Sequence, residues 1–223
     1  MIREVNAGGD QHIAAVREIM KMKFTDKKDP ESKKNRDTAK VVNFRYIYGG
    51  TKWGFHLDVN MPPFGLARYQ EILDGLDAKY YGLKNWQDRK IKSVYQGETI
   101  ILPTGRRFAI YKQPDKKTGE LKYKVNQVKN YPVQGFATGD IVPVVLTEFE
   151  KRIAGMQSCL VNTVHDSLVA DVHPDETQGV IQVVENLNGN LNNIIQEAYG
   201  VEMNVPLLLE AKIGPNWLDT KDV

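Results

Sequence analysis

Two cations and two aromatic residues recur at every fourth position in one segment: Arg36, Lys40, Phe44 and Tyr48. Four residues advance a helix by ~400°, so the side chains would form one stripe ~18 Å long. The cations could hold phosphate oxygens, and the aromatic rings could stack on a sugar or a base. The order of cations followed by aromatic rings therefore matches a nucleoside triphosphate, which has charged phosphates at one end and a flat base at the other. The same spacing also fits an amphipathic helix that buries Phe44 and Tyr48 in a core.

An imidazole and a carboxylate adjoin each other between two apolar segments of residues 160–172. His165 and Asp166 stand at the turn that joins these segments. A tight turn projects its side chains from a rigid sheet, which suits a metal ligand. An Asp in a hairpin is also commonly a turn former without any chemistry, and the residues alone leave both readings open.

Periodicity indicates an α+β chain with a helical half and a mixed half. The boundary lies near the turn at residues 116–119, which gives regions 1–118 and 119–223. Apolar spacing predicts helices over residues 10–23, 33–48, 67–97, 137–153 and 174–198. Turn signatures predict a hairpin over 99–111, a strand–turn–strand unit over 160–172 and a last strand over 205–213.

The small overall net charge of +2 hides a strong division. Residues 1–130 contain 26 Lys and Arg against 15 Asp and Glu, a net charge of +11. Residues 131–223 contain 4 against 13, a net charge of −9. The basic half would attract a polyanion through counterion release, and the acidic half could hold divalent cations. An uneven solvated surface is the alternative.

Cysteine content and hydropathy exclude several classes of protein. The single cysteine, Cys159, rules out a disulfide framework, and its apolar surroundings predict a small core residue. No apolar run approaches the ~20 residues of a membrane span, and the N-terminus lacks an apolar signal core. We therefore expect a soluble cytoplasmic protein without a membrane partner.

The segment from Arg36 to Gly49 resembles a motif of family A (DNA polymerase I-like) DNA polymerases, R-x3-K-x3-[F/Y]-x3-Y-G. In that family the motif lies on the fingers helix that binds the incoming dNTP. The resemblance implies that Arg36 and Lys40 hold the triphosphate, with Lys40 among the catalytic residues. It also implies that Phe44 stacks beside sugar and base and that Tyr48 closes the base pocket.

Two neighbouring positions extend or limit this match. Asp10-Gln11-His12 is similar to the family's D-x-H, whose histidine also contacts the triphosphate. Without the resemblance, His12 reads as a helix N-terminal residue beside a capping Asp10. Arg45 departs from the glycine that bacterial members commonly carry, so the packing beside Phe44 has to differ.

Residues 164–167 resemble the family's V-H-D-E motif. The resemblance implies that His165 is a catalytic residue near the primer terminus and that Asp166 is a catalytic carboxylate that binds two Mg²⁺ ions. Ser167 replaces the usual glutamate, so one carboxylate of the family pattern is missing.

Residues 130–135 are similar to the family's N-x-P-x-Q-G, in which Asn and Gln contact the minor groove of the primer–template DNA. Asn130 and Gln134 match these positions, and Gln can reach acceptors that every base pair presents there. A loop leading into a helix, with Gln134 capping or exposed, is the alternative. Weaker resemblances run in family order at residues 104–107, 205–210 and 216–217.

The resemblance implies a right-hand polymerase in part: a fingers subdomain over 1–118 and the C-terminal part of an antiparallel palm over 119–223. No string similar to the first palm motif, which carries the other catalytic Asp, occurs here, and the thumb is missing too. We therefore expect a DNA-directed DNA polymerase that is active only with an N-terminal partner chain. That partner would carry the thumb, the first palm motif and an optional 3′–5′ exonuclease.

The implied reaction is template-directed nucleotidyl transfer from dNTPs, assisted by two Mg²⁺ ions shared with the partner's Asp. The pattern is typical of the second chain of a split bacteriophage polymerase, which would act in the host-cell cytoplasm. Ser167 and the missing carboxylate leave open a non-catalytic module that binds DNA and nucleotide in a regulatory role.

Overall fold

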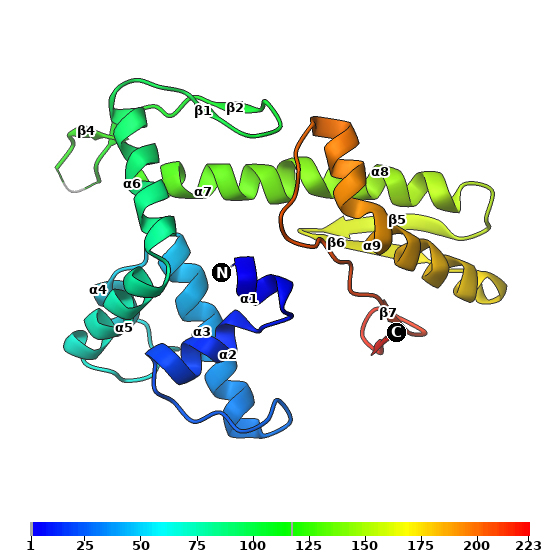
Figure 1. Ribbon diagram of the computed structural model, residues 1–223, viewed down its shortest axis with the longest axis horizontal. Coiled ribbons are helices and arrows are strands. Elements are labelled where there is room, and N and C mark those ends of the chain that lie inside the picture. Colours follow the sequence, from blue (N-terminus) through cyan, green and yellow to red (C-terminus); the bar gives the residue numbers. More distant parts are fainter. Residues whose placement is uncertain (1, 117) are drawn as a thin grey trace. The chain divides into compact units, whose positions relative to one another are not determined.

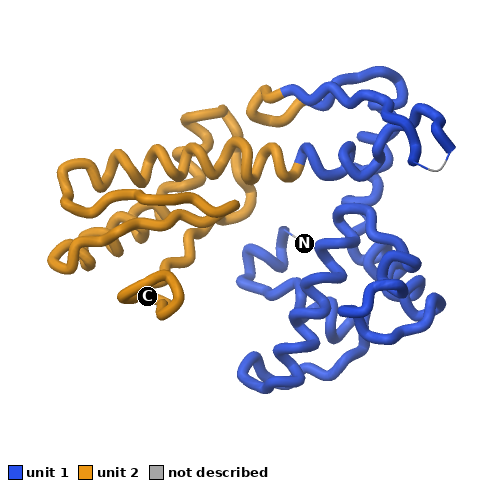
Figure 2. Tube along the Cα trace, turned by 180° about the vertical axis from the view of Figure 1, so that it is seen from behind, with its two compact units in different colours: residues 1–100, 107–132 blue, residues 101–106, 133–223 orange. Residues whose placement is uncertain are grey.

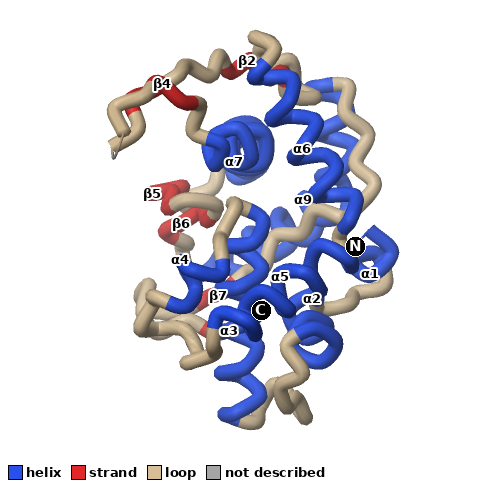
Figure 3. The backbone as a smooth tube through the Cα atoms, turned by 90° about the vertical axis from the view of Figure 1, so that its left-hand side faces the viewer, coloured by secondary structure: helices blue, strands red, loops and turns tan. Residues whose placement is uncertain are grey.

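The computed structural model describes residues 2–116 and 118–223 of the chain. Helices dominate, and the short strands pair two by two (Figures 1 and 3). The chain divides into two compact units, one of residues up to 100 with 107–132 and one of residues 101–106 with 133–223 (Figure 2). The mixture of helices and small antiparallel hairpins confirms the predicted α+β class.

The first unit is mainly helical. Its helices are α1 (Ile2–Asn6), α2 (Gln11–Ala14), the π-helix η1 (Ala15–Ile19), α3 (Pro30–Ile47), α4 (Lys52–His56), α5 (Leu66–Lys79) and α6 (Tyr81–Tyr95). Hairpin β1 (Ile100–Ile101)–β2 (Arg107–Phe108) and hairpin β3 (Gln113–Pro114)–β4 (Leu121–Lys122) precede α7 (Val125–Phe136). The boundary between the units falls within α7, after Pro132.

Helix α3 has a defined start and a defined end. Asp29 caps its N-terminus by accepting the Ser32 backbone N–H at 2.9 Å, and Pro30 occupies the first helical position. At the other end, Gly50 N–H donates to the Arg45 carbonyl at 2.6 Å, and Gly49 adopts a left-handed φ of +87°. These features form a Schellman motif, so the predicted helix over 33–48 is confirmed with an earlier start.

The core of the first unit forms where α3 meets η1, α4 and α5. Ala39 and Val42 of α3 are fully buried, together with Val16, Tyr69 and Leu76. Burying a side chain such as Leu or Val stabilises the fold by about 1.5–3 kcal/mol. This packing fixes which face of α3 turns inward and leaves the adjoining face accessible.

Two predicted helices are interrupted in the structure. The helix expected over 10–23 changes from α-helix to π-helix at Ala15 and ends at Met20, where Lys21 takes a left-handed φ of 51°. The helix expected over 67–97 breaks at Tyr80, whose ring is buried in the core. The break redirects α6, and Gln87 then donates a 2.8 Å hydrogen bond to the Ile47 carbonyl at the end of α3. Tertiary contacts thus override a continuous helical pattern.

The second unit packs two helices and a hairpin. Its elements are the π-helix η2 (Ala137–Ile141), α8 (Val142–Ile153), β5 (Cys159–Val164), β6 (Ser167–Asp171), the 3₁₀-helix η3 (Pro174–Glu176), α9 (Thr177–Tyr199), β7 (Lys212–Ile213) and β8 (Lys221–Asp222). Helices α8 and α9 lie beside the β5–β6 hairpin (Figure 1). Their core side chains are Val145, Phe149, Ile153, Val180, Val183, Leu187, Leu191 and Ile195.

The predictions for this unit are confirmed in its helices and in the 160–172 hairpin. On the inward face of α9, Val183 and Ile195 are buried, while Val184 and Ile194 are only partly buried at its margin. Cys159 is exposed on β5, so its predicted place in a core is wrong.

The strand expected over 205–213 is wrong for most of its length. Only residues 212–213 are strand, and they pair with 221–222. Residues 205–209 lie along α9, and side-chain amides of α9 form the hydrogen bonds that a neighbouring strand would otherwise provide. Asn188 accepts from Leu209 N–H at 2.6 Å and donates to the Leu209 carbonyl at 3.0 Å. One turn later, Asn192 binds the Val205 carbonyl and the Leu207 N–H.

The two compact units change over at 132/133 rather than near 118/119, because residues 119–132 pack with the first unit. A division of the chain into compact units does not define functional subdomains. The boundary between fingers and palm at 118/119 therefore stays a prediction. Part of the turn expected at 116–119 lies outside the described residues, at Lys117. None of the described helices combines the length and apolar character needed to cross a membrane.

Replacing Asn188 with Ala should lower the free energy of unfolding by about 1–3 kcal/mol, because the Leu209 N–H and carbonyl both lose their partner. Urea denaturation followed by circular dichroism measures this change. Asn190→Ala is the matched control, since Asn190 is exposed on the same helix and its amide donates to the carbonyl of Asn186 within that helix. Equal effects of the two substitutions would contradict the anchoring role of Asn188.

Candidate functional site

The stripe predicted on α3 does not enter the core. The helix buries Ser32, which precedes the stripe, and Asn35, Ala39, Val42 and Asn43, which lie one or two positions before a stripe residue. Phe44 is 45% exposed, and Lys40 is exposed as well. An aromatic core residue would be nearly inaccessible, so the alternative that buries Phe44 is wrong. Tyr48 is half-buried at the C-cap of the helix.

Helix α2 brings His12 to the same stripe. Its Nδ1 lies 3.1 Å from the Asn43 Nδ2, and its ring centroid lies 5.9 Å from that of Phe44. The Lys40 ammonium lies 6.0 Å from the Phe44 ring centroid. A lysine ammonium, an imidazole and an exposed aromatic ring therefore share one surface of the first unit.

The Asp10 carboxylate joins the two helices that carry these residues. Its Oδ1 accepts the backbone N–H groups of His12 at 2.9 Å and Ile13 at 3.1 Å, which caps α2. Its Oδ2 accepts Arg36 Nε at 2.7 Å. Within the described chain, only the Nε of that guanidinium is engaged, so its terminal amino groups remain suited to phosphate oxygens.

The charges around this surface shift two pKa values. Burial opposes ionisation of Asp10, but the hydrogen bonds from Arg36 and from the α2 backbone prevail and lower its pKa below 3.8. Burial lowers the pKa of His12 below its usual 6.5, and Arg36 and Lys40 lower it further against the opposing effect of Asp10. The imidazole is therefore neutral at physiological pH, although the carboxylate of Asp10 lies near it beside the cations Arg36 and Lys40.

Arg45, the departure from the family pattern, has partners away from the stripe. Its guanidinium forms an ion pair with Asp58 and lies 5.9 Å from the Phe55 ring centroid. These contacts accommodate the long side chain next to Phe44 without covering the Phe44 ring.

The predicted DNA-contact residues lie on a helix rather than in a loop. Asn130 and Gln134 are one turn apart on α7, and Pro132 between them is buried. Gln134 is exposed and accepts a hydrogen bond from Thr138 Oγ1 at 3.0 Å. The Asn130 Oδ1 is buried and has no hydrogen-bond partner in the described chain. The loop of the alternative interpretation is thus wrong, whereas its exposed Gln134 is found.

The carboxylate hairpin has a two-residue turn. Val164 pairs with Ser167, which leaves His165 and Asp166 exposed at the tip. His165 has a left-handed φ of 56°, as two-residue hairpins require at this position. The register shifts between Leu160 and Asn162, and such bulges are common beside functional sites.

The described residues do not by themselves provide a cluster of carboxylates that would hold two Mg²⁺ ions. No three His, Cys, Asp or Glu side chains cluster as metal ligands anywhere in residues 2–116 and 118–223. The Ser167 hydroxyl donates to the Val164 carbonyl at 2.8 Å and carries no charge. Asp166 is exposed and could serve as one ligand of a site that other residues complete.

Two groups of structurally important residues were not identified from the sequence. Asn43 lies inside the Arg36–Gly49 motif, but its position in the sequence does not predict the contact with His12. Asp140 is 3% exposed and accepts Arg106 Nε at 2.6 Å and Thr104 Oγ1 at 2.5 Å, which fixes the 101–106 segment to η2. The adjacent resemblance at Thr104–Arg107 was the only signal for this network.

The structure thus brings together part of the predicted site. His12, Arg36, Lys40 and Phe44 share one surface of the first unit, and Tyr48 ends the same helix. His165 and Asp166 occupy the hairpin of the second unit. Asn130 and Gln134 fall on either side of the division within α7.

A polymerase-domain fold is shown by comparison with solved structures. The chain is similar to the POL domain of Pol1 from M. smegmatis, in complex with DNA primer-template and dNTP, with a TM-score of 0.70 and 19% identity. The similarity covers 92% of this chain and 34% of that one.

The family model for DNA polymerase family A matches residues 1–219, and the chain belongs to this family. It is 26% identical to DNA polymerase I of Aquifex aeolicus (strain VF5) over 88% of this chain and 32% of that protein. With DNA polymerase I of Deinococcus radiodurans the identity is 24%, over 83% and 18%. The chain spans about a third or less of the length of these relatives.

Substituting Asp10 with Asn should destabilise the first unit by roughly 1 kcal/mol at neutral pH, because the cap remains and the ion pair with Arg36 is lost. A carboxylate whose pKa is lowered on folding stabilises the protein above its unfolded pKa of 3.8. The difference between wild type and Asp10→Asn should therefore persist above pH 4 and vanish as the pH falls through the lowered pKa.

Chemical denaturation at several pH values measures this dependence. Asp37→Asn removes an exposed carboxylate from α3 and should change the stability little. A stability difference for Asp10→Asn that persisted unchanged in strong acid would refute the ionic role of Asp10.

Proposed function

We propose that this chain binds the incoming dNTP and the primer–template DNA as part of a DNA-directed DNA polymerase. The observation that carries the proposal is the exposure of Phe44 beside Lys40, Arg36 and His12 on one surface. A stripe that ran into a core could not receive a ligand. Membership of DNA polymerase family A supports the same conclusion.

Each residue of the surface has a separate role in this proposal. Arg36 offers two amino groups in a planar fork to the triphosphate, because Asp10 engages only its Nε. Lys40 supplies a compact charge one turn further on and neutralises phosphate as the bond to the leaving pyrophosphate breaks. Phe44 stacks against sugar and base, and Tyr48 ends the base pocket.

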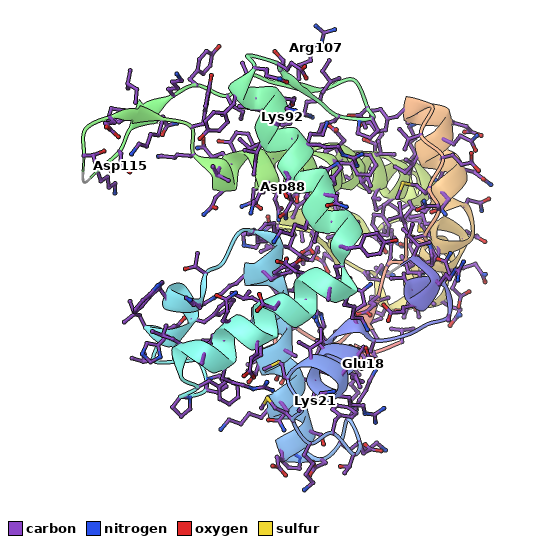
Figure 4. The ribbon with its side chains drawn as sticks, turned by 60° about the vertical axis from the view of Figure 1, so that its left-hand side comes forward. Glu18, Lys21, Asp88, Lys92, Arg107 and Asp115 are labelled. Carbon is purple, nitrogen blue, oxygen red and sulfur yellow. The ribbon has the colours of Figure 1, made fainter. Side chains whose placement is uncertain are left out.

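We assign primer–template contacts to Asn130, Gln134 and His165. Gln134 and His165 are exposed, whereas Asn130 is partly buried and its Oδ1 is inaccessible. Exposed cations of the basic half would follow the phosphate backbone. Arg107 is one of these, and its side chain points away from the β1–β2 hairpin (Figure 4). The structurally similar M. smegmatis domain is itself in complex with primer–template and dNTP.

We further propose that Asp166 is one ligand of a two-Mg²⁺ site that a second polypeptide completes. Its exposed place at the hairpin tip and the neutral Ser167 beside it support a shared site. When bound, the ions would assist nucleotidyl transfer. In this proposal residues 1–118 act as fingers and 119–223 as part of the palm. An origin as the second chain of a split bacteriophage polymerase in the host cytoplasm stays a prediction.

A second candidate function is a non-catalytic module that binds DNA and nucleotide. The observation that favours it is the isolation of Asp166 from other acidic metal ligands in the described chain. The two candidates differ in one property, since only the first predicts synthesis when a complementary chain is added.

Extension of a labelled, primed template separates the two candidates. We expect no synthesis with Mg²⁺ by the chain alone, and synthesis by its mixture with an upstream polypeptide that carries the thumb and the first palm motif. Asp166→Asn should abolish synthesis by the mixture, whereas Asp175→Asn, at an exposed position of η3, should not. Robust synthesis by the chain alone that survives Asp166→Asn would overturn the proposal.

Lys40→Ala should reduce kcat/KM for every dNTP in the complete enzyme by about 10- to 150-fold, the equivalent of the ~1.5–3 kcal/mol of a charged hydrogen bond. Steady-state kinetics of single-nucleotide incorporation measures the loss. Lys34→Ala is the matched control, because Lys34 is an exposed lysine two positions before Arg36 and so on the opposite side of α3. Unchanged kinetics for Lys40→Ala would remove Lys40 from the site.

A further inference from the structure

The contact between Asn43 and His12 is the feature that the proposed roles of the stripe leave unexplained. Asn43 is only 6% exposed and lies on the buried side of α3, next to the stripe. Its amide nitrogen lies 3.1 Å from His12 Nδ1. Its amide oxygen is buried and has no hydrogen-bond partner in the part of the chain that the structure describes. The only polar contact of this buried amide within the described chain is thus with the imidazole.

This geometry determines where a neutral imidazole carries its proton. An amide nitrogen can only donate, so the ring nitrogen that faces it has to accept. Nδ1 is then unprotonated, and the single ring proton resides on Nε2. The cations Arg36 and Lys40 and the carboxylate Asp10 are the charged groups nearest this ring, and the two cations disfavour a second ring proton.

We propose that Asn43 is a positioning residue that holds His12 in the Nε2–H tautomer and thereby makes it a neutral hydrogen-bond donor to the triphosphate. The proposal rests on the proposed dNTP site for its ligand, but not for the tautomer itself. With this orientation, the surface offers phosphate oxygens an imidazole N–H in addition to the cations Arg36 and Lys40, whose charges act on the same ring. The opposite tautomer would present a lone pair to phosphate, which repels it.

The tautomer is measurable without any nucleotide. Long-range ¹H–¹⁵N correlation spectra of the ¹⁵N-labelled full chain distinguish a protonated from an unprotonated ring nitrogen for each of the four histidines. His12→Gln identifies the His12 signals by their loss. We expect a protonated Nε2 and an unprotonated Nδ1 in the wild type at neutral pH.

Two substitutions in α3 test whether Asn43 is the cause. Asn43→Asp keeps the shape but places an acceptor against Nδ1, so the ring should move to the Nδ1–H or the doubly protonated form. Asn35→Asp is the matched control, because Asn35 is equally buried on α3 but donates to the Lys23 carbonyl. A wild-type Nδ1–H tautomer, or His12 signals unaltered by Asn43→Asp, would overturn the proposal.

The functional consequence is measured with dATP. Asn43→Ala should weaken dATP binding to the full chain by roughly three- to tenfold, as expected for a lost neutral hydrogen bond. In the His12→Gln background the same substitution should have little further effect, because the two residues act as one unit. An equal loss in both backgrounds would mean that Asn43 acts structurally, and would overturn its role as a positioning residue.

Failure of the proposed function has a different signature. If the wild-type tautomer and its dependence on Asn43 are observed but saturating dATP leaves the His12 signals unmoved, the dNTP site is wrong while the control of the tautomer stands. If dATP shifts the His12 Nε2–H signal in wild type and not in Asn43→Asp, both are supported.

Discussion

The candidate nucleotide surface depends on one carboxylate. Asp10 accepts two backbone N–H groups at the start of α2 and the guanidinium of Arg36 on α3. Two elements about 26 positions apart in sequence are thereby held so that His12 reaches Phe44 and Asn43. Because the carboxylate is partly buried and fully bonded, removing its charge would leave Arg36 free to move. The positions of His12 and Arg36 therefore depend on a residue that need not contact a ligand itself.

Packing then determines which side of α3 a ligand can reach. The helix buries small and polar residues, Ser32, Asn35 and Ala39 among them, rather than its large aromatic ones. This inversion of the usual amphipathic pattern leaves Phe44 accessible and also explains why apolar periodicity alone could not settle its place. In the second unit, polar side chains also take over a backbone function. The amides of Asn188 and Asn192 hydrogen-bond the backbone of the 205–209 segment, which has no neighbouring strand as a partner.

Much of the fold could be predicted from local patterns. The Gly49-Gly50 pair defined the end of α3, and the turn at His165-Asp166 defined the β5–β6 hairpin, because these signals act through backbone geometry over a few residues. The start of α3 after the Asp29 cap lies three residues before the predicted one. The break at Tyr80 and the π-helical turn of η1 could not be predicted, since they arise from burial and from contacts with distant residues. The prediction that Cys159 lies in a core was wrong for a related reason. Residues that are surrounded by apolar neighbours in the sequence need not be surrounded by them in space.

The sequence by itself determined the family, the chemical order of the stripe on α3 and the isolated carboxylate at the hairpin, because motif identity and spacing are local properties. Only the tertiary structure decided that Phe44 is accessible, that Arg45 is engaged by Asp58, and that Asn43 faces the imidazole of His12. These outcomes depend on which helix faces meet. The burial of Val16, Val42 and Tyr69 in a common core determines these faces. The spacing of residues within a single helix could not predict which faces are buried together.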